Sequence, residues 1–209
     1  MKIIKQENNE NIFPFIAYIP DNVSDNPALI IQLHGAGERG NGKDELEKVL
    51  RLGYANIVND DNLKDCILIM PQCPTGTFWV AKIESLKNFI DEMCLKFSAD
   101  KKRIYLCGLS MGGFGAWYTA MAYPQLFAAI LPCCGGGMAW NADTLKMPIW
   151  TFHGLEDRTV SPNQTKEMVE RLKETNPFLK YDFLEGVAHD SWNNAFTITT
   201  LNWLLSQAK

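Results

Sequence analysis

The stretch YLCGLSMGGFGAW, residues 105–117, places a serine between glycines at the point where an apolar run gives way to small residues. The apolar residues before the serine are typical of a buried strand, and the segment after it favours a helix. Residues 108–112, GLSMG, fit the G-x-S-x-G pattern, in which a serine is held on a tight strand-to-helix turn. The pattern predicts that Ser110 is a nucleophile. The alternative is a glycine-rich helix start that only packs closely.

Apolar segments alternate with amphipathic segments along the rest of the chain. Strands are expected at residues 12–19, 28–33, 66–70, 103–108, 127–133, 148–153 and 180–186, and helices at residues 82–97, 162–175 and 192–205. Pro14 limits the first strand to a sheet edge, and Ser161 and Ser191 are the expected N-caps of the last two helices. This order predicts an α/β fold with a mainly parallel central sheet, helices on both faces and no cap domain, and residues 1–209 are expected to form one domain.

A serine hydroxyl needs a base to react at neutral pH, and the chain has three histidines. His189 lies in the loop after the last strand, where functional residues of an open parallel sheet collect, so it is the expected base. His34 and His153 each precede a glycine at a strand end, and we expect both to be structural, with satisfied hydrogen bonds. Asp157 is the expected acid that orients the base, in the chain order Ser, Asp, His. Its neighbour Glu156 is the alternative acid.

The attacked carbonyl of a substrate would need hydrogen-bond donors for its developing negative charge. The backbone N–H of Met111, directly after the serine, is one expected donor of this oxyanion hole. The second is expected in the glycine-rich loop after the first central strand, from Ala36, with Gly37 as the alternative. A glycine turn without chemistry would explain the same residues.

With these residues placed, the chain resembles α/β-hydrolases of the esterase group that includes polyhydroxybutyrate-depolymerase-like, feruloyl-esterase-like and phospholipase/carboxylesterase-like proteins. Similar motifs occur in dienelactone-hydrolase-like and prolyl-oligopeptidase-type domains. The resemblance runs through LHGAGERG (33–40), PQCP (71–74), RIYLCGLSMGG (103–113), FHGLEDRTV (152–160) and GVAHDSW (186–192). It implies an α/β-hydrolase fold, with Ser110, Asp157 and His189 as a triad and the Ala36 and Met111 amides as the oxyanion hole.

The expected activity is hydrolysis of carboxylic esters through an acyl-enzyme, on a small-molecule ester with a short-chain or aryl acyl group, which could be linked to a carbohydrate. Trp79, Trp140 and Trp192 fall in loops at the catalytic end and are the candidate substrate-binding residues. A peptidase, a thioesterase or an acyltransferase would use the same triad. A non-catalytic binding module on this scaffold is a more remote alternative, because such modules usually lose a triad member.

Composition excludes several other classes of partner. The formal net charge is −4 and no basic cluster occurs, so nucleic acid and anionic membrane surfaces are not expected partners. No apolar run is long enough to span a membrane or to form a signal peptide, which leaves the cytoplasm as the expected location. Most of the six cysteines lie in apolar runs, as reduced core thiols would. The sequence indicates no metal site and no cofactor, and it does not indicate an oligomeric state.

Overall fold

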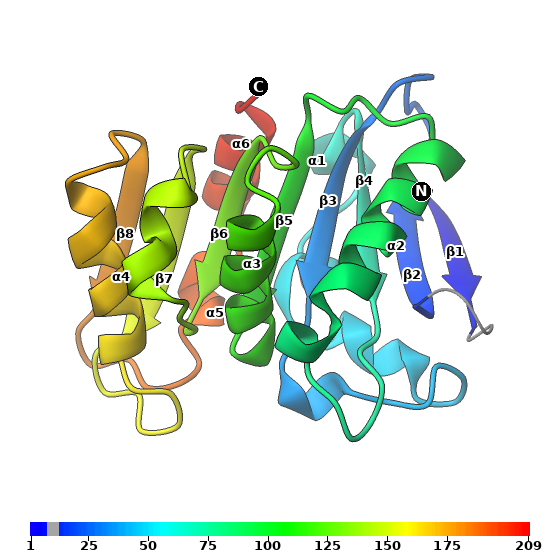
Figure 1. Cartoon of the computed structure of the whole chain (residues 1–209). Helices are drawn as coiled ribbons and strands as arrows, with labels where there is room; N and C mark the ends of the chain where they lie inside the picture. The colour runs from blue at the N-terminus through cyan, green and yellow to red at the C-terminus, as the bar shows by residue number, and fades with distance from the viewer. Residues whose placement is uncertain (8–12) are drawn as a thin grey trace.

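A computed structural model describes residues 1–7 and 13–209 of the chain (Figure 1). The described residues form one eight-stranded sheet with the order β1-β2-β4-β3-β5-β6-β7-β8. The strands are β1 (Lys2–Gln6), β2 (Phe15–Ile19), β3 (Ala28–Leu33), β4 (Cys66–Pro71), β5 (Ile104–Leu109), β6 (Ala129–Cys133), β7 (Ile149–Gly154) and β8 (Leu179–Leu184). β2 runs antiparallel to both of its neighbours, and β4, β3, β5, β6, β7 and β8 pair in parallel. The expected α/β fold with a mainly parallel sheet is confirmed.

Helices cover both faces of the sheet (Figure 1). One face carries α2 (Ile83–Lys96), α3 (Met111–Ala122) and α4 (Asn163–Lys173), and the other carries α1 (Asp60–Leu63), α5 (Trp192–Ala195) and α6 (Ile198–Leu205). Short 3-10 helices occur at Ala36–Glu38 (η1), Leu46–Leu50 (η2), Gly53–Asn56 (η3), Trp79–Lys82 (η4) and Ala139–Thr144 (η5). Among the described residues, no cap domain covers the carboxyl ends of the strands, and no helix is both long and apolar enough to cross a bilayer.

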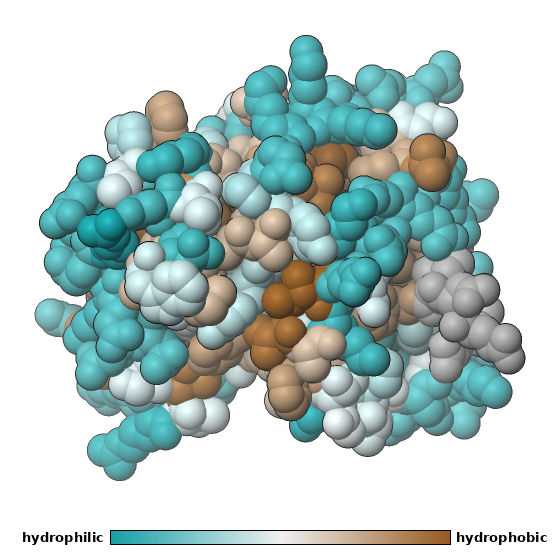
Figure 2. Space-filling model, in the orientation of Figure 1, coloured by the Kyte–Doolittle hydropathy of each residue, from teal (hydrophilic) through white to brown (hydrophobic). Residues whose placement is uncertain are grey.

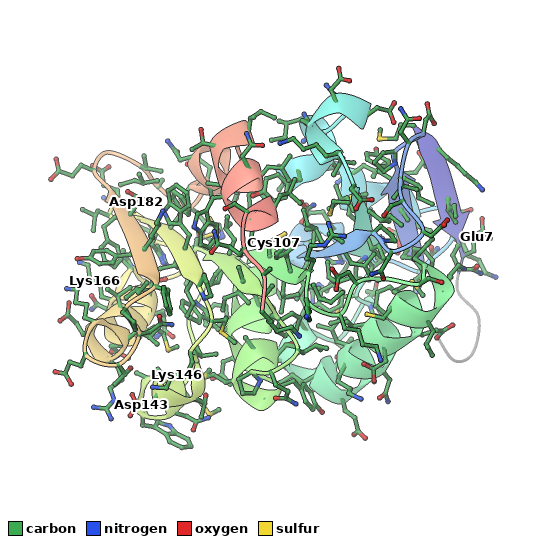
Figure 3. All side chains as sticks on the ribbon, turned by 90° about the horizontal axis from the view of Figure 1, so that it is seen from above. Glu7, Cys107, Asp143, Lys146, Lys166 and Asp182 are labelled. Carbon is green, nitrogen blue, oxygen red and sulfur yellow. The ribbon has the colours of Figure 1, made fainter. Side chains whose placement is uncertain are left out.

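The central strands are buried on both sides, which explains their continuous apolar sequences. In β3, Leu29 and Ile31 belong to the core beneath α2 and α3, whereas Ile30 belongs to the core on the opposite face. Cys107 of β5 lies near the middle of the molecule when it is seen from above (Figure 3). All six cysteines are buried and unpaired, which confirms that they are core thiols.

The first strand differs from its prediction. β2 begins at Phe15, and residue 12 lies outside the described part of the chain. The prediction that this strand lies at the sheet edge is wrong, because β1 pairs along the outer side of β2. β1 escaped prediction because most of its residues are exposed or half-buried, so its sequence KIIKQ lacks the regular alternation of a strand with one buried face.

Two helix starts also differ from their predictions. α4 begins at Asn163 and not at Pro162, but the side chain of Ser161 still accepts a hydrogen bond from the N–H of Asn163, 3.4 Å away. Residues 192–205 form two helices instead of one, and Ser191 makes no capping hydrogen bond. The second of these helices, α6, has a capping box of its own, made by Thr197 and Thr200.

Candidate active site

Ser110 occupies a strained turn between β5 and α3. Its backbone has φ 54° and ψ −119°, a region that residues with a side chain rarely adopt. A Cβ on Gly108 would lie 2.2 Å from the carbonyl oxygen of Gly112, and a Cβ on Gly112 would lie 2.1 Å from the carbonyl oxygen of Leu33. Both distances are far inside van der Waals contact, so the two glycines of the motif are required by the packing of backbone on backbone.

The turn is also held by its own hydrogen bonds. The N–H of Ser110 donates to the carbonyl of Cys133 at the end of β6, 2.9 Å away. The carbonyl of Ser110 accepts from Phe114 as the first bond of α3. The serine side chain is left at the carboxyl end of the sheet, where it is partly exposed.

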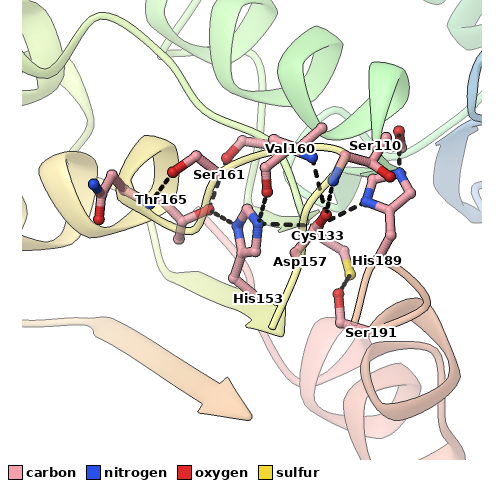
Figure 4. A network of polar contacts seen from close by, with 12 residues as sticks. Ser110, Cys133, His153, Asp157, Val160, Ser161, Thr165, His189 and Ser191 are labelled. Atoms are coloured by element: carbon pink, nitrogen blue, oxygen red, sulfur yellow. Dashed lines mark hydrogen bonds and ion pairs between the residues drawn. The ribbon is translucent and has the colours of Figure 1, made fainter. Parts of the chain in front are cut away.

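The structure brings Ser110, His189 and Asp157 together from three separate loops (Figure 4). Nε2 of His189 lies 2.9 Å from Oγ of Ser110, and Nδ1 lies 2.6 Å from Oδ2 of Asp157. The other carboxylate oxygen, Oδ1, accepts from the backbone N–H groups of Thr159 at 2.8 Å and Val160 at 2.9 Å. Because the carboxylate can only accept, Nδ1 of His189 carries the proton between them, and Nε2 is free to accept from the serine.

Electrostatics keeps Asp157 ionised. Burial alone would raise the pKa of this carboxyl, but the hydrogen bonds from His189 and from the amides of Val160 and Thr159 outweigh it and lower the pKa. Glu156 is exposed, and its side chain makes no hydrogen bond to His189 in the described structure. Its backbone N–H donates to the carbonyl of Val187. Of the two adjacent carboxylates, the structure places that of Asp157 against His189.

His34 is buried with both ring nitrogens satisfied, as expected of a structural histidine. Its Nε2 accepts from the backbone N–H of Cys73 at 2.9 Å, and its Nδ1 lies 2.6 Å from the carbonyl oxygen of Gly35. Burial lowers the pKa of His34 to about 4, so the ring is neutral at pH 7. The ring therefore ties the loop after β3 to the loop after β4.

Trp79 does not lie at the rim of the cleft, which corrects the prediction that it binds substrate. Its side chain is wholly buried, and its indole N–H donates to the carbonyl of His34 at 3.0 Å. The ring also packs edge-on against the imidazole of His34, with 5.1 Å between ring centres. Trp79 thus belongs to the core that supports the loop after β3.

The other two tryptophans are more exposed. The ring of Trp192 stands edge-on to His189, with 5.2 Å between ring centres, and its residue is half-buried. Trp140 lies in η5 and is 77% exposed. Neither lines the pocket beside Ser110.

A small apolar pocket of about 280 Å³ opens beside Ser110. It is lined by Phe78, Val80, Ser110, Met111, Phe114 and Val160. Figure 2 shows hydrophobic residues gathered on this side of the molecule near the lower ends of α2 and α3. Val80, Phe114 and Val160 were not predicted from the sequence as pocket residues. The helical spacing of Phe114, four residues after the serine, was the one available signal.

Two backbone amides near Ser110 have no acceptor within the described chain. Met111 is the first residue of α3, where an N–H has no partner in its own helix, and Ala36 opens the exposed η1. The loop that carries Ala36 adjoins the serine, since a Cβ on Gly35 would lie 3.7 Å from Cβ of Ser110. The amide of Gly37 is likewise unpaired in the described structure.

The chain matches the family model described as Phospholipase/Carboxylesterase over residues 79–201, more than half of its length. It is 24% identical over 169 residues to the bifunctional acetylxylan esterase/xylanase XynS20E of Neocallimastix patriciarum, a match that covers 75% of this chain and 23% of that protein. It is 30% identical over 121 residues to poly(3-hydroxyalkanoate) depolymerase C of Paucimonas lemoignei, a match that covers 42% of this chain and 29% of that protein. The chain therefore spans about a quarter of the length of these curated relatives.

Two solved structures share the fold along the whole chain. A thermostable esterase superposes with a TM-score of 0.80 and 28% identity, covering 100% of this chain and 63% of that one. A mutant feruloyl esterase module from Clostridium thermocellum, complexed with sinapinate, superposes with a TM-score of 0.79 over 99% of this chain and 88% of its own. At 15% identity, the second likeness is one of fold alone.

Proposed function

The chain belongs to the phospholipase/carboxylesterase family of α/β-hydrolases, and from that premise we propose that it hydrolyses carboxylic esters through an acyl-enzyme formed on Ser110. The observation that carries the proposal is the continuous chain of contacts from Oγ of Ser110 to His189 at 2.9 Å and on to Asp157 at 2.6 Å. The serine at one end of these contacts is held in a strained turn, which is the geometry of an activated nucleophile.

The steps follow from which atoms hold protons. His189 takes the proton of Ser110 at Nε2 while Oγ attacks the ester carbonyl, and Asp157 stabilises the imidazolium that forms. Collapse of the tetrahedral intermediate breaks the bond to the alkoxy group, which leaves as an alcohol after receiving that proton. A water molecule then repeats the sequence on the acyl-enzyme, releasing the carboxylic acid and restoring Ser110.

The unpaired amides of Met111 and Ala36 are the proposed oxyanion hole, with Gly37 as the alternative to Ala36. Both candidate loops adjoin the serine, and neither amide must break a protein hydrogen bond to bind an oxyanion. The start of α3 behind Met111 adds a favourable dipole toward the same negative charge.

The pocket beside Ser110 supports the proposal that the substrate carries a short-chain or aryl acyl group. With a volume of about 280 Å³ and walls from Phe78, Val80, Phe114 and Val160, it is too small and too open to enclose a long chain. Aromatic walls favour a flat acyl group. The relatives named acetylxylan esterase support an ester carried on a carbohydrate, and Trp192 beside His189 is the proposed contact for such a substrate.

A panel of p-nitrophenyl esters, methyl hydroxycinnamates, acetylated sugars, a thioester and a peptide amide tests this function. We expect kcat/KM to be highest for acetyl to butyryl or for aryl esters and to fall for decanoyl and longer chains, because each added methylene gains little of the roughly 0.8 kcal/mol that full burial provides. A steady rise out to palmitoyl esters would contradict the open pocket. Efficient cleavage of the amide or the thioester would instead favour a peptidase or a thioesterase. If no member of the panel is hydrolysed, the remaining alternative is a non-catalytic binding module.

A further inference from the structure

A second histidine touches the acid of the proposed triad. His153, at the end of β7, is completely buried, and its Nε2 lies 3.3 Å from Oδ2 of Asp157 and 3.0 Å from the carbonyl oxygen of Val160. On the other side of the ring, Nδ1 lies 2.6 Å from Oγ1 of Thr165 in α4, and that hydroxyl is 2.7 Å from the carbonyl oxygen of Gly135 (Figure 4). The sequence predicts a structural role for His153, without a link to the site.

The partners of the ring decide where its proton sits. The carbonyl of Val160 and the ionised carboxylate of Asp157 can only accept, so Nε2 must carry a proton and donate toward both. Burial lowers the pKa of His153, which favours a neutral ring with Nδ1 as an acceptor. The one proton of the Thr165 hydroxyl has two acceptors within reach, Nδ1 of His153 and the carbonyl oxygen of Gly135. The single proton of the neutral ring is needed at Nε2, against a carboxylate and a carbonyl, so the hydroxyl must turn its proton to Nδ1. The neutral tautomer with a proton on Nε2 therefore fits the surroundings.

In this arrangement both oxygens of the Asp157 carboxylate have hydrogen-bond donors against them. Two backbone amides hold Oδ1, and two imidazoles, His189 and His153, lie against Oδ2. The first imidazole keeps 22% of its side chain exposed and faces the serine, whereas the second is fully buried and is anchored to α4 through Thr165. The carboxylate cannot rotate without losing at least one of these donors.

We propose that His153 is a positioning residue, whose Nε2–H fixes the Asp157 carboxylate in the orientation that His189 requires. The inference rests on the proposed function, since it concerns the same triad. A residue of this kind does not touch substrate, so its loss is expected to lower kcat while leaving KM within a factor of about two.

Two nearly isosteric substitutions separate the N–H from the shape of the ring. His153→Gln can place an N–H where Nε2 stands, whereas His153→Met fills the same space without a donor. We expect kcat to fall by about tenfold or more in His153→Met, with KM nearly unchanged, and to recover most of that loss in His153→Gln. Equal kcat values in the two variants, whether both high or both low, would overturn the proposal.

A measurement on the unaltered protein covers the case in which His153→Met does not fold or the chain proves not to be an esterase. Long-range ¹H–¹⁵N correlation spectra at pH 7 report the tautomer of each histidine ring. We expect His153 to carry its proton on Nε2 alone. A proton on Nδ1 alone would overturn the proposal, because no donor would then face Asp157, and this readout is independent of any substrate.

Discussion

The serine turn, residues 108–113, and the acid loop, residues 155–161, hold their functional groups by different means. In the turn, backbone lies against backbone: besides Gly108 and Gly112, a Cβ on Gly113 would lie 2.3 Å from the carbonyl oxygen of Cys133. In the acid loop, Asp157 is held by donors placed around its carboxylate. Damage to the turn should therefore appear first as a loss of stability, and damage to the acid loop first as a loss of rate.

The largest of these effects is expected in the acid loop. Asp157→Asn should lower kcat by roughly 10²- to 10⁴-fold, because the amide presents the wrong hydrogen-bonding pattern to Nδ1 of His189. Steady-state kinetics on a short-chain ester measures the loss, and circular dichroism should show an unchanged fold. Glu156→Gln is the matched control, because its side chain is exposed and lies next to Asp157 in the chain. A larger loss in the control would assign the acid to Glu156.

In the serine turn, Gly112→Ala should lower the free energy of unfolding by about 3 kcal/mol, since the new methyl group would meet the carbonyl oxygen of Leu33 at 2.1 Å. Urea denaturation measures the change. Gly37→Ala is the control for stability, because nothing lies within 4 Å of a Cβ at that position. Equal stability in the two variants would show that the turn is not held by close packing.

The loop after β3 is held both by close packing and by hydrogen bonds. A change of pH tests the hydrogen bonds alone, because they involve His34. Burial lowers the pKa of His34 from 6.5 in the unfolded chain to about 4 in the folded protein. The unfolded state therefore binds the extra proton first, and stability falls as the pH drops from about 6.5 toward 4. Between pH 7 and pH 5 this one group should cost about 2 kcal/mol.

The variant His34→Gln isolates that contribution, because its side-chain oxygen can still accept from Cys73 but does not titrate. Urea denaturation at pH 7 and pH 5 should show a smaller loss of stability in the variant than in the parent protein. The same loss in both proteins would mean that His34 is as easily protonated in the folded state as in the unfolded chain.

The contrast between the two regions also explains what the sequence could predict. The serine turn depends on glycines that are local and regularly spaced, so the five residues GLSMG are enough to indicate it. Asp157 and His189 followed from the order of strands and loops. These predictions needed only the chain order and the properties of single residues.

Contacts that depend on the path of the loops were not predictable in this way. Trp79 was expected at the cleft, but its indole N–H finds the carbonyl of His34, which lies 45 positions earlier in the chain. The contact between His153 and Asp157 joins a strand end to the loop that follows, and a buried histidine looks the same in sequence whether or not it reaches a carboxylate. Both depend on how the loops fold against one another, for which no local pattern exists.

The central claim, that Ser110 is the nucleophile, is tested most directly by covalent labelling with a fluorophosphonate, followed by mass spectrometry of the digested protein. We predict a single adduct on Ser110, absent from Ser110→Ala and formed far more slowly in His189→Gln. Ester hydrolysis should fall by at least about 10⁴-fold in Ser110→Ala. Ser98→Ala is the control, since that serine also has a positive φ, 51°, and should leave both readouts unchanged. An adduct on another serine, or ester hydrolysis that persists in Ser110→Ala, would contradict the claim.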